Sequence, residues 1–564
     1  MRLGRGHAPK LPSALIVGAT TPLYLGPKYR EINSHDGRLP TSRRTATAQG
    51  STPGSVGAEL LKCTPRDNYP SLGSLDPGGV NIHTHLTSMV AALLSQIPQR
   101  MKLLLLLPLA AEALALRGCV RRELPQLRMA SHTGAPRRCT RAHMVATAAA
   151  TSPAAMAAVS SSDEWIDNLD MRAFGAEVRD LGKRMAANEG DGDLRHFEKM
   201  RRWSNAFGIL GVATMALPAN PVSIFCLSTY IYSRWAMIAH HTCHGGYDRH
   251  RLPHFSGRTF ALGGPLHRAR DWLDWMLPEA WNHEHNVLHH YQLGERGDPD
   301  LVERNLGFVR AWPFPVAVKL AFVVIMSSVW KWVYYAPNTY KQLKLSEYRK
   351  AHGGSAPPGL DAEAALTLGK LLRSNELRGG LFKPAEFLLR VFAPVVAFRF
   401  LLLPAPLLLL PGTGRACFVH AVTNLVLADM LSNVHAFATI VTNHAGSDLY
   451  RFETSCAPNS AEFLSRAVLS SANYPAGATG TVRGDLNDFF HGFLNYQAEH
   501  HCWPNLSMLS YQRAAPQLKS ICQRHGVPYT CENVLVRTRK TVAIMVGVDS
   551  MKVWPDERVG VATR

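Results

Sequence analysis

The sequence His285-Asn286-Val287-Leu288-His289-His290 is one of four short histidine clusters between residues 240 and 501. The others are His240-His241-Thr242-Cys243-His244, Asn443-His444 and Gln497-Ala498-Glu499-His500-His501. Three of the four place a histidine three or four residues after another histidine or after a glutamine, a spacing that puts side chains on one face of a helix. We therefore expect the rest of the chain to hold these clusters toward a common point.

The clusters offer eight candidate metal ligands: His240, His244, His285, His289, His290, His444, His500 and His501. Imidazole binds iron, copper, nickel and zinc, so the ligand type leaves the metal open. One tetrahedral zinc would leave about half of these histidines unused, whereas two octahedral metals would use them all. Each cluster also has a plainer interpretation, as a polar anchor at a membrane interface, a solvated histidine run or a structural histidine. Four clusters together favour a site for two metals.

The composition predicts a membrane protein and excludes other classes. Only 18% of the 564 residues are charged, and the apolar residues fall into a few long runs. The ten cysteines are scattered without C-x-x-C pairs, which excludes a zinc ribbon and a disulfide scaffold. Residues 1–150 contain 19 Lys/Arg and 7 Asp/Glu, so they supply most of the net charge of +19. No zinc-finger, RNA-recognition or basic-zipper pattern accompanies this charge, so we expect no nucleic-acid partner.

Residues 1–162 read as a disordered leader. Residues 103–116 are apolar but too short to span a bilayer comfortably. Residues 129–162 contain no acidic residue and combine three arginines with Ala, Ser and Thr, which is typical of an organelle transit peptide. We predict a plastid membrane as the location, with the endoplasmic reticulum as the alternative.

The apolar runs predict an all-α membrane protein with two transmembrane hairpins, or about four spans. Residues 204–239 form the first hairpin, and residues 386–411 with 416–442 form the second. If residues 311–336 also crossed, the second and last clusters would face opposite sides of the bilayer. We therefore place 311–336 on the surface, where its lysines, prolines and Trp/Tyr cluster suit the interface. A helical cap over residues 445–564 then carries the metal site.

These motifs together resemble those of the membrane fatty acid desaturases, which carry three histidine boxes of the forms HxxxH, HxxxHH and HxxHH or QxxHH. Gln497 opens the third box as in the acyl-lipid and front-end subgroup. Asp298-Pro299-Asp300 resembles the DPDI segment of the family, and Asn443-His444 resembles its additional ligand. The stretch Asp76-Pro77-Gly78-Gly79 lacks the histidine of the haem motif HPGG, so we expect no fused cytochrome domain.

The resemblance implies an enzyme with two iron ions that uses O2 and two electrons to introduce a double bond into an acyl chain of a lipid, with O2 reduced to water. The eight histidines would ligate the irons. We expect five further residues to support them: His241, His283, Asn443, Gln497 and Glu499. Electrons would come from a separate carrier, either ferredoxin or a free b-type cytochrome. The basic residues Arg249, Arg251, Arg258, Arg268 and Arg270 are candidates for docking an acidic carrier, or are ordinary residues flanking a span.

Two other functions remain open on the same residues. A hydroxylase or ketolase acting on a carotenoid, sterol or alkane would use the same scaffold, and a metal transporter would use histidines as carriers. A transporter predicts ionisable residues within the spans, whereas these clusters lie at or beyond the span ends. We predict four regions: a leader (1–162), a helical segment before the membrane (163–203), the desaturase domain (204–535) and a C-terminal tail (536–564).

Overall fold

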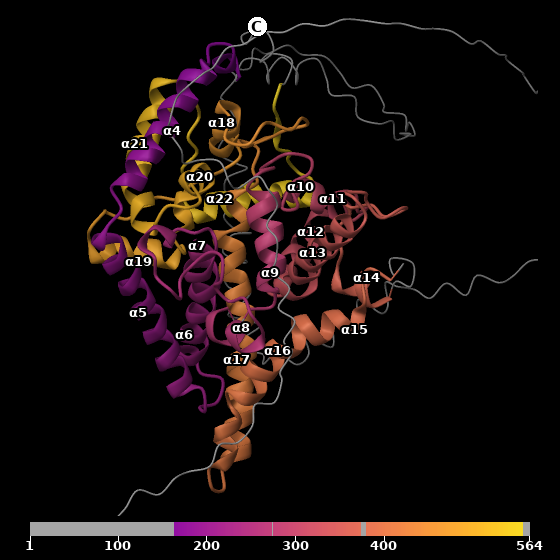
Figure 1. The fold of residues 1–564 in the computed structure, drawn as a ribbon. Helices are drawn as coiled ribbons and strands as arrows, with labels where there is room; N and C mark the ends of the chain where they lie inside the picture. Colours follow the sequence, from indigo (N-terminus) through magenta and orange to yellow (C-terminus); the bar gives the residue numbers. More distant parts are fainter. Residues whose placement is uncertain (1–162, 273, 374–379, 556–564) are drawn as a thin grey trace, which may run out of the picture. The chain divides into compact units, whose positions relative to one another are not determined.

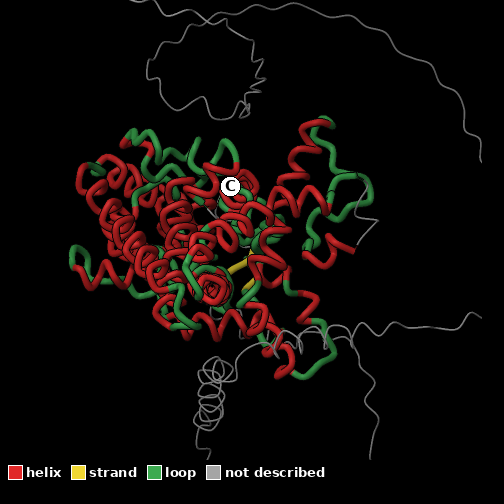
Figure 2. The backbone as a smooth tube through the Cα atoms, turned by 90° about the horizontal axis from the view of Figure 1, so that it is seen from below, coloured by secondary structure: helices red, strands yellow, loops and turns green. Residues whose placement is uncertain are grey.

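The computed structural model describes residues 163–272, 274–373 and 380–555, and these residues are almost entirely helical. Figure 2 shows helices throughout, joined by loops of varied length. The strands within the described residues are β1 (Tyr450–Arg451) and β2 (Lys552–Val553), which pair in parallel with Tyr450 opposite Lys552. The prediction of a helical fold is confirmed for this part of the chain, with one short pair of strands added to it. The predicted leader and transit segment lie outside the described residues.

The first helices lead to the first histidine cluster. The side chain of Asp170 caps α4 by accepting a hydrogen bond from the backbone nitrogen of Ala173 at 2.9 Å. Asn220 caps α6 in the same way, and Pro221 suits the first helical position because its missing N–H needs no partner there. The elements are η2 (Glu164–Ile166), α4 (Met171–Ala187), α5 (Asp191–Thr214), α6 (Pro221–Tyr232), η3 (Ser233–Ala239) and α7 (His240–Cys243).

Short helices fill the middle of the chain and carry the second cluster. A bend of 83° separates Val316–Ser327 from Lys331–Ala351, so the predicted surface segment 311–336 is a broken helix. The elements are η4 (Asp248–His250), α8 (Pro265–Asp271), α9 (Pro278–Trp281), η5 (Asn282–His289), α10 (Val302–Asn305), α11 (Gly307–Arg310), α12 (Val316–Ser327), η6 (Lys331–Tyr335), α13 (Ala336–Ala351) and α14 (Leu368–Arg373).

Two helices among the described residues are long and apolar enough to cross a membrane: Pro384–Leu409 and Gly414–Asn443. The first is built from α15 (Pro384–Phe387), η8 (Leu388–Phe392), α16 (Ala393–Val395), η9 (Val396–Leu402) and η10 (Ala405–Leu409). The second is α17 (Gly414–Thr439), continued by η11 (Val441–Asn443). Large apolar side chains such as Leu409 and Val419 are exposed on both helices, as expected for surfaces that face lipid.

The described residues contain fewer candidate spans than the four that the sequence predicted. The structure supports two spans, or three if the bent pair α12 and α13 counts as one. The hairpin expected at 204–239 is present, but charged residues fill the first half of α5 and only its last turns are apolar. Its tip exposes Ile209, Leu217 and Phe225, but neither helix is among the described helices that are both long and apolar enough to span a membrane. Figure 1 shows α6 beside α17, and the two helices pack together.

A buried ion pair joins the two spanning helices. Arg399 on η9 donates to the carboxylate of Asp429 on α17 over an N–O distance of 2.8 Å, and the indole nitrogen of Trp275 donates to the same oxygen at 2.8 Å. Both charged side chains are buried. Because an unpaired charge in an apolar environment is costly, this pair is expected to hold the hairpin in one packing arrangement.

The remaining helices form the cap and carry the last cluster. Figure 1 shows α4 running beside α21, and α18 also packs on α4. The α5 and α22 helices each run across a predicted region boundary, at 203 and at 535, and those boundaries stay predictions. The elements are α18 (Ala461–Leu469), α19 (Val482–Phe490), η12 (Leu494–Tyr496), α20 (Gln497–Cys502), α21 (Met508–Arg524) and α22 (Val534–Val546).

Candidate metal centre

The first cluster lies where a π-helix returns to an α-helix. The π-helical segment η3 ends at Ala239, and α7 starts with His240. The backbone nitrogen of His244 donates to the carbonyl of His240 at 3.1 Å, so the two imidazoles lie on one face, with ring centroids 4.9 Å apart and the rings tilted by 44°. Both side chains point toward the histidines of the second and third boxes, because His240 and His244 each contact the rings of His285 and His500.

The second cluster lies on the π-helix η5. The backbone nitrogen of His290 bonds to the carbonyl of His285 at 3.1 Å, a spacing of five residues instead of four. This wider turn brings His290 back over His285, and their rings lie 4.8 Å apart. His289 still stacks on His285 as the sequence predicted, but it also reaches His444 and His501 on the other side. The two adjacent histidines therefore point to different neighbours.

The remaining predicted ligands come from the end of the second span and from α20. His444 follows η11 directly, and its Nδ1 bonds to the carbonyl of Ile440 at 2.8 Å. His500 and His501 lie on the short helix α20. The ring of His500 contacts His240, His244 and His290, whereas the ring of His501 contacts His289, His290 and His444.

All eight predicted ligands converge in two groups. The five-histidine group contains His240, His244, His285, His290 and His500, and the three-histidine group contains His289, His444 and His501. Within each group the candidate ligand atoms all lie within 4.8 Å of one another. Each adjacent pair, His289-His290 and His500-His501, divides between the two groups. Because residues before and after the spanning hairpin meet here, that hairpin enters and leaves the membrane on the same side.

The spacing of the nitrogens fits metal coordination. The Nε2 atom of His240 lies 3.0 Å from Nε2 of His285 and 3.0 Å from Nε2 of His500. Two imidazole nitrogens bound at right angles to one ion, each at about 2.1 Å, would be separated by about 3 Å. The Nε2 atoms of His244, His289 and His290 are buried without a hydrogen-bond partner in the described structure. These inward, unpaired nitrogens fit a pair of metal ions.

Burial keeps most of these imidazoles in the neutral form that binds metal. It lowers the pKa of every histidine in the five-histidine group well below the ordinary imidazole value, and neighbouring histidines add to the effect. Burial also lowers the pKa of His444 to about 3. His289 differs: burial alone would lower its pKa, but the carboxylate of Asp298 outweighs burial and raises it.

Hydrogen bonds from the surrounding chain orient the three-histidine group. His289 Nδ1 lies 2.9 Å from the Asp298 carboxylate, and His501 Nδ1 lies 2.8 Å from the Ser471 hydroxyl. Such bonds fix the ring orientation and leave Nε2 for the metal. In the five-histidine group, His500 Nδ1 lies 3.3 Å from the Tyr511 hydroxyl. Asp298 belongs to the DPD motif that the sequence singled out, whereas no sequence signal marked Ser471 or Tyr511.

Three of the five predicted supporting residues border the two groups. The Gln497 amide nitrogen lies 3.2 Å from Nε2 of His444 and 3.0 Å from Nε2 of His501. Asn443 donates to the side-chain oxygen of Gln497 at 3.3 Å. His241 stacks beside His240 and His500, and its Nδ1 bonds to the carbonyl of Met237 at 2.7 Å.

The other two supporting residues lie differently from the expectation. The Glu499 carboxylate accepts hydrogen bonds from Asn473 at 2.8 Å and Tyr529 at 2.7 Å, so it anchors α20 to the cap instead of orienting an imidazole. His283 belongs to neither group. Burial, with nearby Lys350 and Arg349, lowers the pKa of His283 to about 4.

A second buried acid borders the second cluster, and the sequence analysis missed it. Glu284 is 1% exposed and accepts a hydrogen bond from the Tyr335 hydroxyl at 3.2 Å. Asp300 has an oxygen 4.0 Å from His289 Nδ1. The available signal was weak, because a glutamate beside histidines on a helix is more often solvated than buried.

Comparison with known proteins agrees with this geometry. The model of the fatty acid desaturase family matches residues 217–533, which is more than half of the chain. An NADPH-dependent stearoyl-CoA 9-desaturase of Mycobacterium tuberculosis is 23% identical over 67% of this chain and 79% of its own length. The Delta(5) fatty acid desaturase A of Dictyostelium discoideum is 24% identical over 54% of this chain and 58% of its own. An acyl-lipid (9-3)-desaturase of Physcomitrium patens is 26% identical over 23% of each chain.

No solved structure matches the chain. The combination of a helical membrane fold, converging histidine boxes and the family match defines the class of protein. This chain belongs to the fatty acid desaturase family, and it is a membrane-bound oxidoreductase.

Proposed function

We propose that this protein is a di-iron desaturase that introduces a double bond into a fatty acyl chain of a lipid. The observation that carries the proposal is the convergence of eight histidines, from four regions of sequence, into groups of five and three around one buried centre. The resemblance of the third box to the QxxHH form supports an acyl-lipid substrate. The named relatives differ in double-bond position and acyl carrier, so the position does not follow from them.

Each histidine group would hold one iron, with the eight imidazoles as ligands. When bound, the irons would activate O2, which with two electrons and two protons removes one hydrogen from each of two adjacent methylene groups. The products are one double bond and two waters. The chain's own contribution is to present neutral nitrogens and to exclude water. Trp281 serves the second purpose, because its ring is 1% exposed and stacks on His285 at 4.5 Å.

The direct test is expression of residues 163–564 in yeast with a host-appropriate leader, followed by analysis of fatty acids by double-bond position. A new unsaturated acyl chain in the wild type, absent in a His500→Ala control, is the expected result. A hydroxylated or oxidised product instead would favour the hydroxylase or ketolase. An unchanged lipid profile from well-expressed protein, with labile zinc in the purified chain, would favour the transporter.

The electron donor is proposed to be a separate acidic carrier, a ferredoxin or a b-type cytochrome. Arg251 and Arg258 support this proposal because both are exposed and line a cavity of about 380 Å³. Their loop folds back on the first box, since a Cβ on Gly257 would lie 3.0 Å from the carbonyl of Cys243. Arg268 is not part of this surface, because it is buried and donates to backbone carbonyls.

The docking proposal is tested with Arg258→Glu, using Arg539→Glu, an exposed arginine on α22, as a charge-matched control. The expected result is a KM for the carrier that rises about tenfold at low salt and less at high salt, with the control unchanged. An equal effect in both variants would contradict the proposal.

The plastid location is also a proposal, and it depends on the composition of residues 129–162. Fusion of this segment to a fluorescent protein in a plant or algal cell should direct the fusion to plastids. Accumulation at the endoplasmic reticulum would instead support the free cytochrome as electron donor.

A further inference from the structure

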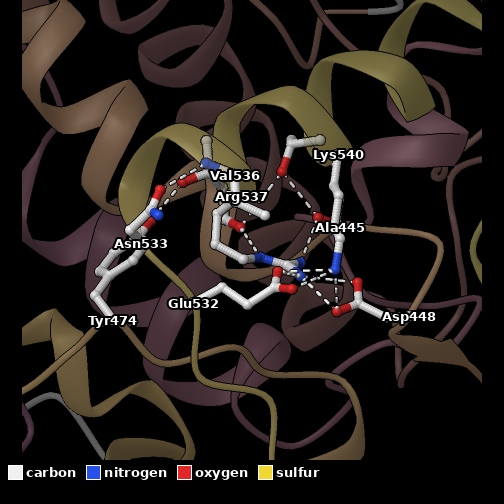
Figure 3. A network of polar contacts seen from close by, with 10 residues as sticks. Ala445, Asp448, Tyr474, Glu532, Asn533, Val536, Arg537 and Lys540 are labelled. Carbon is white, nitrogen blue, oxygen red and sulfur yellow. Dashed lines mark hydrogen bonds and ion pairs between the residues drawn. The ribbon is translucent and has the colours of Figure 1, made fainter. Parts of the chain in front are cut away.

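The helix α22 begins directly after the region that matches the family model, which ends at residue 533. Asn533 caps it by accepting from the backbone nitrogen of Val536 at 2.9 Å, and Gly547 ends it with a φ of 79°. Figure 3 shows that α22 directs Arg537 inward against the chain around Ala445. The Arg537 side chain is completely buried.

Arg537 binds the backbone on both sides of His444. Its Nε donates to the carbonyl of Thr442 at 3.4 Å, and an NH2 group donates to the carbonyl of Ala445 at 2.9 Å. Thr541, one turn further along α22, donates to the same two carbonyls at 3.3 and 2.8 Å. Two side chains of α22 therefore fix the carbonyl two residues before and the carbonyl one residue after a candidate ligand, His444.

Two acids and a lysine hold the guanidinium in place. Arg537 NH1 lies 2.7 and 2.8 Å from the two carboxylate oxygens of Asp448 and 3.3 Å from Glu532, and Lys540 bridges the same acids. Gly446 leaves room for this arrangement, because a Cβ there would lie 2.5 Å from the guanidinium nitrogen. A buried arginine with this many partners has essentially one orientation.

We propose that Arg537 is a positioning residue for His444 and that α22 locks the three-histidine group into its metal-binding geometry. This inference rests on the two-iron function proposed above. Within the described structure, the hydrogen bonds of α22 to other segments reach the chain around His444 and the helices α11 and α12, and none reaches a residue next to the five-histidine group. The effect of Arg537 should therefore fall on one of the two irons.

The test measures iron per chain in the purified full-length wild type and in Arg537→Lys, after dialysis against the same concentration of a chelator. Arg537→Lys keeps the charge but loses the fork that binds two carbonyls. We expect about tenfold weaker retention of one iron, with the other iron held as in the wild type. In a His444→Ala background the same substitution should cause no further loss, because the two changes act through one ligand.

Arg268→Lys is the matched control. Arg268 is also a buried arginine that donates to backbone carbonyls, those of Asp274, Arg390 and Val391, and none of these residues flanks a histidine of either group. A general loss of stability would lower iron retention in both variants. Equal iron loss in Arg268→Lys and Arg537→Lys, or additive loss in the double variant with His444→Ala, would overturn the inference.

Thr541→Val keeps the inference testable if Arg537→Lys does not fold. This variant removes one hydroxyl that donates to Ala445 and leaves the buried charges paired. A smaller loss of the same iron is expected, and unchanged iron would overturn the inference. Fewer than two irons in the wild type would instead contradict the proposed function, so the two failures are distinguishable.

Discussion

The two histidine groups hold their imidazole rings in position by different contacts. The five-histidine group is rich in candidate ligands, and its rings pack directly on one another, with centroid separations such as 4.3 Å between His244 and His290. The three-histidine group has fewer ligands, but each ring is bonded through Nδ1 to a different part of the chain, namely Asp298, Ile440 and Ser471. Contacts between the rings therefore fix the geometry of the five-histidine group, whereas hydrogen bonds to the surrounding chain fix that of the three-histidine group.

This contrast predicts where each group is vulnerable. Loss of one imidazole leaves four in the first group but only two in the second. Loss of a supporting side chain matters little where neighbouring rings fix the orientation, and it matters more where one hydrogen bond does so. The following variants test that difference, from the largest expected effect to the smallest.

Removal of a ligand from the smaller group should have the largest effect. We expect His444→Ala to lower desaturation by more than about 100-fold and to lose one iron per chain, because two imidazoles hold an ion poorly. His240→Ala should lose less iron, because four histidines remain in its group. Fatty-acid profiles and iron content of the two variants provide the measurement. Greater iron loss in His240→Ala would reverse the comparison.

Removal of the charged support of His289 should have the next largest effect. Asp298→Asn keeps the shape of the side chain but removes the charge that raises the pKa of His289 and fixes its ring. We expect iron affinity at the three-histidine group to fall about 10-fold to 100-fold. Competition with a chelator at several concentrations measures it. Retention equal to the wild type would show that this group does not depend on its support.

Removal of a support in the five-histidine group should have a small effect. Tyr511→Phe removes the hydroxyl that lies 3.3 Å from His500 Nδ1, a long contact beside six other ring neighbours of His500. We expect iron affinity to change less than about threefold, well below the usual effect of an outer support. The same chelator competition serves as the measurement. If iron affinity fell as much in Tyr511→Phe as in Asp298→Asn, the two groups would depend equally on their hydrogen-bonded supports.

A change in the cap, away from both histidine groups, should have the smallest effect on iron binding. It serves as a control because it should alter only the stability of the fold and the acid dependence of that stability. Burial alone would raise the pKa of Asp485, but hydrogen bonds from His196, Lys199 and Gln512 outweigh it and lower the pKa. A lowered carboxyl pKa stabilises the fold above the ordinary value near 3.8 and loses that effect as pH falls through the lowered value.

We therefore expect Asp485→Asn to lower the free energy of unfolding at pH 7 by roughly 1 kcal/mol or more, to flatten the acid dependence below about pH 4, and to leave the iron ratio of the two groups unchanged. Thermal unfolding against pH, with iron content, measures both. A selective loss of one iron would show that the cap favours one group.

The sequence predicted which histidines lie together better than it predicted their arrangement. All eight candidate histidines converge: seven come from the three boxes, and His444 was added by the resemblance to the family's additional ligand. The division of His289 from His290 was not predictable from an α-helical period, because the π-helix η5 changes the turn at that point. Ser471 lies 30 residues before His501, and only the fold brings it to the imidazole.

The membrane arrangement was predicted in part. The spanning hairpin at 384–443 follows from long apolar runs, whereas the apolar stretch at 204–239 is divided between the end of α5 and a helix with a π-helical end. No pattern in the sequence indicated that α22 would contact the chain around His444. Arg537 lies in a segment read as a tail, and only its buried contacts with Thr442 and Ala445 reveal what it binds.

The central claim is that two groups of histidines hold two metal ions at one centre. The most direct measurement is the metal content of the purified wild-type chain by mass spectrometry, with Mössbauer spectroscopy of iron-57 protein to distinguish the two environments. The account predicts about two irons per chain with two unequal signals, one for the five-histidine group and one for the three-histidine group. A single iron, or zinc that is removed by brief dialysis, would contradict it.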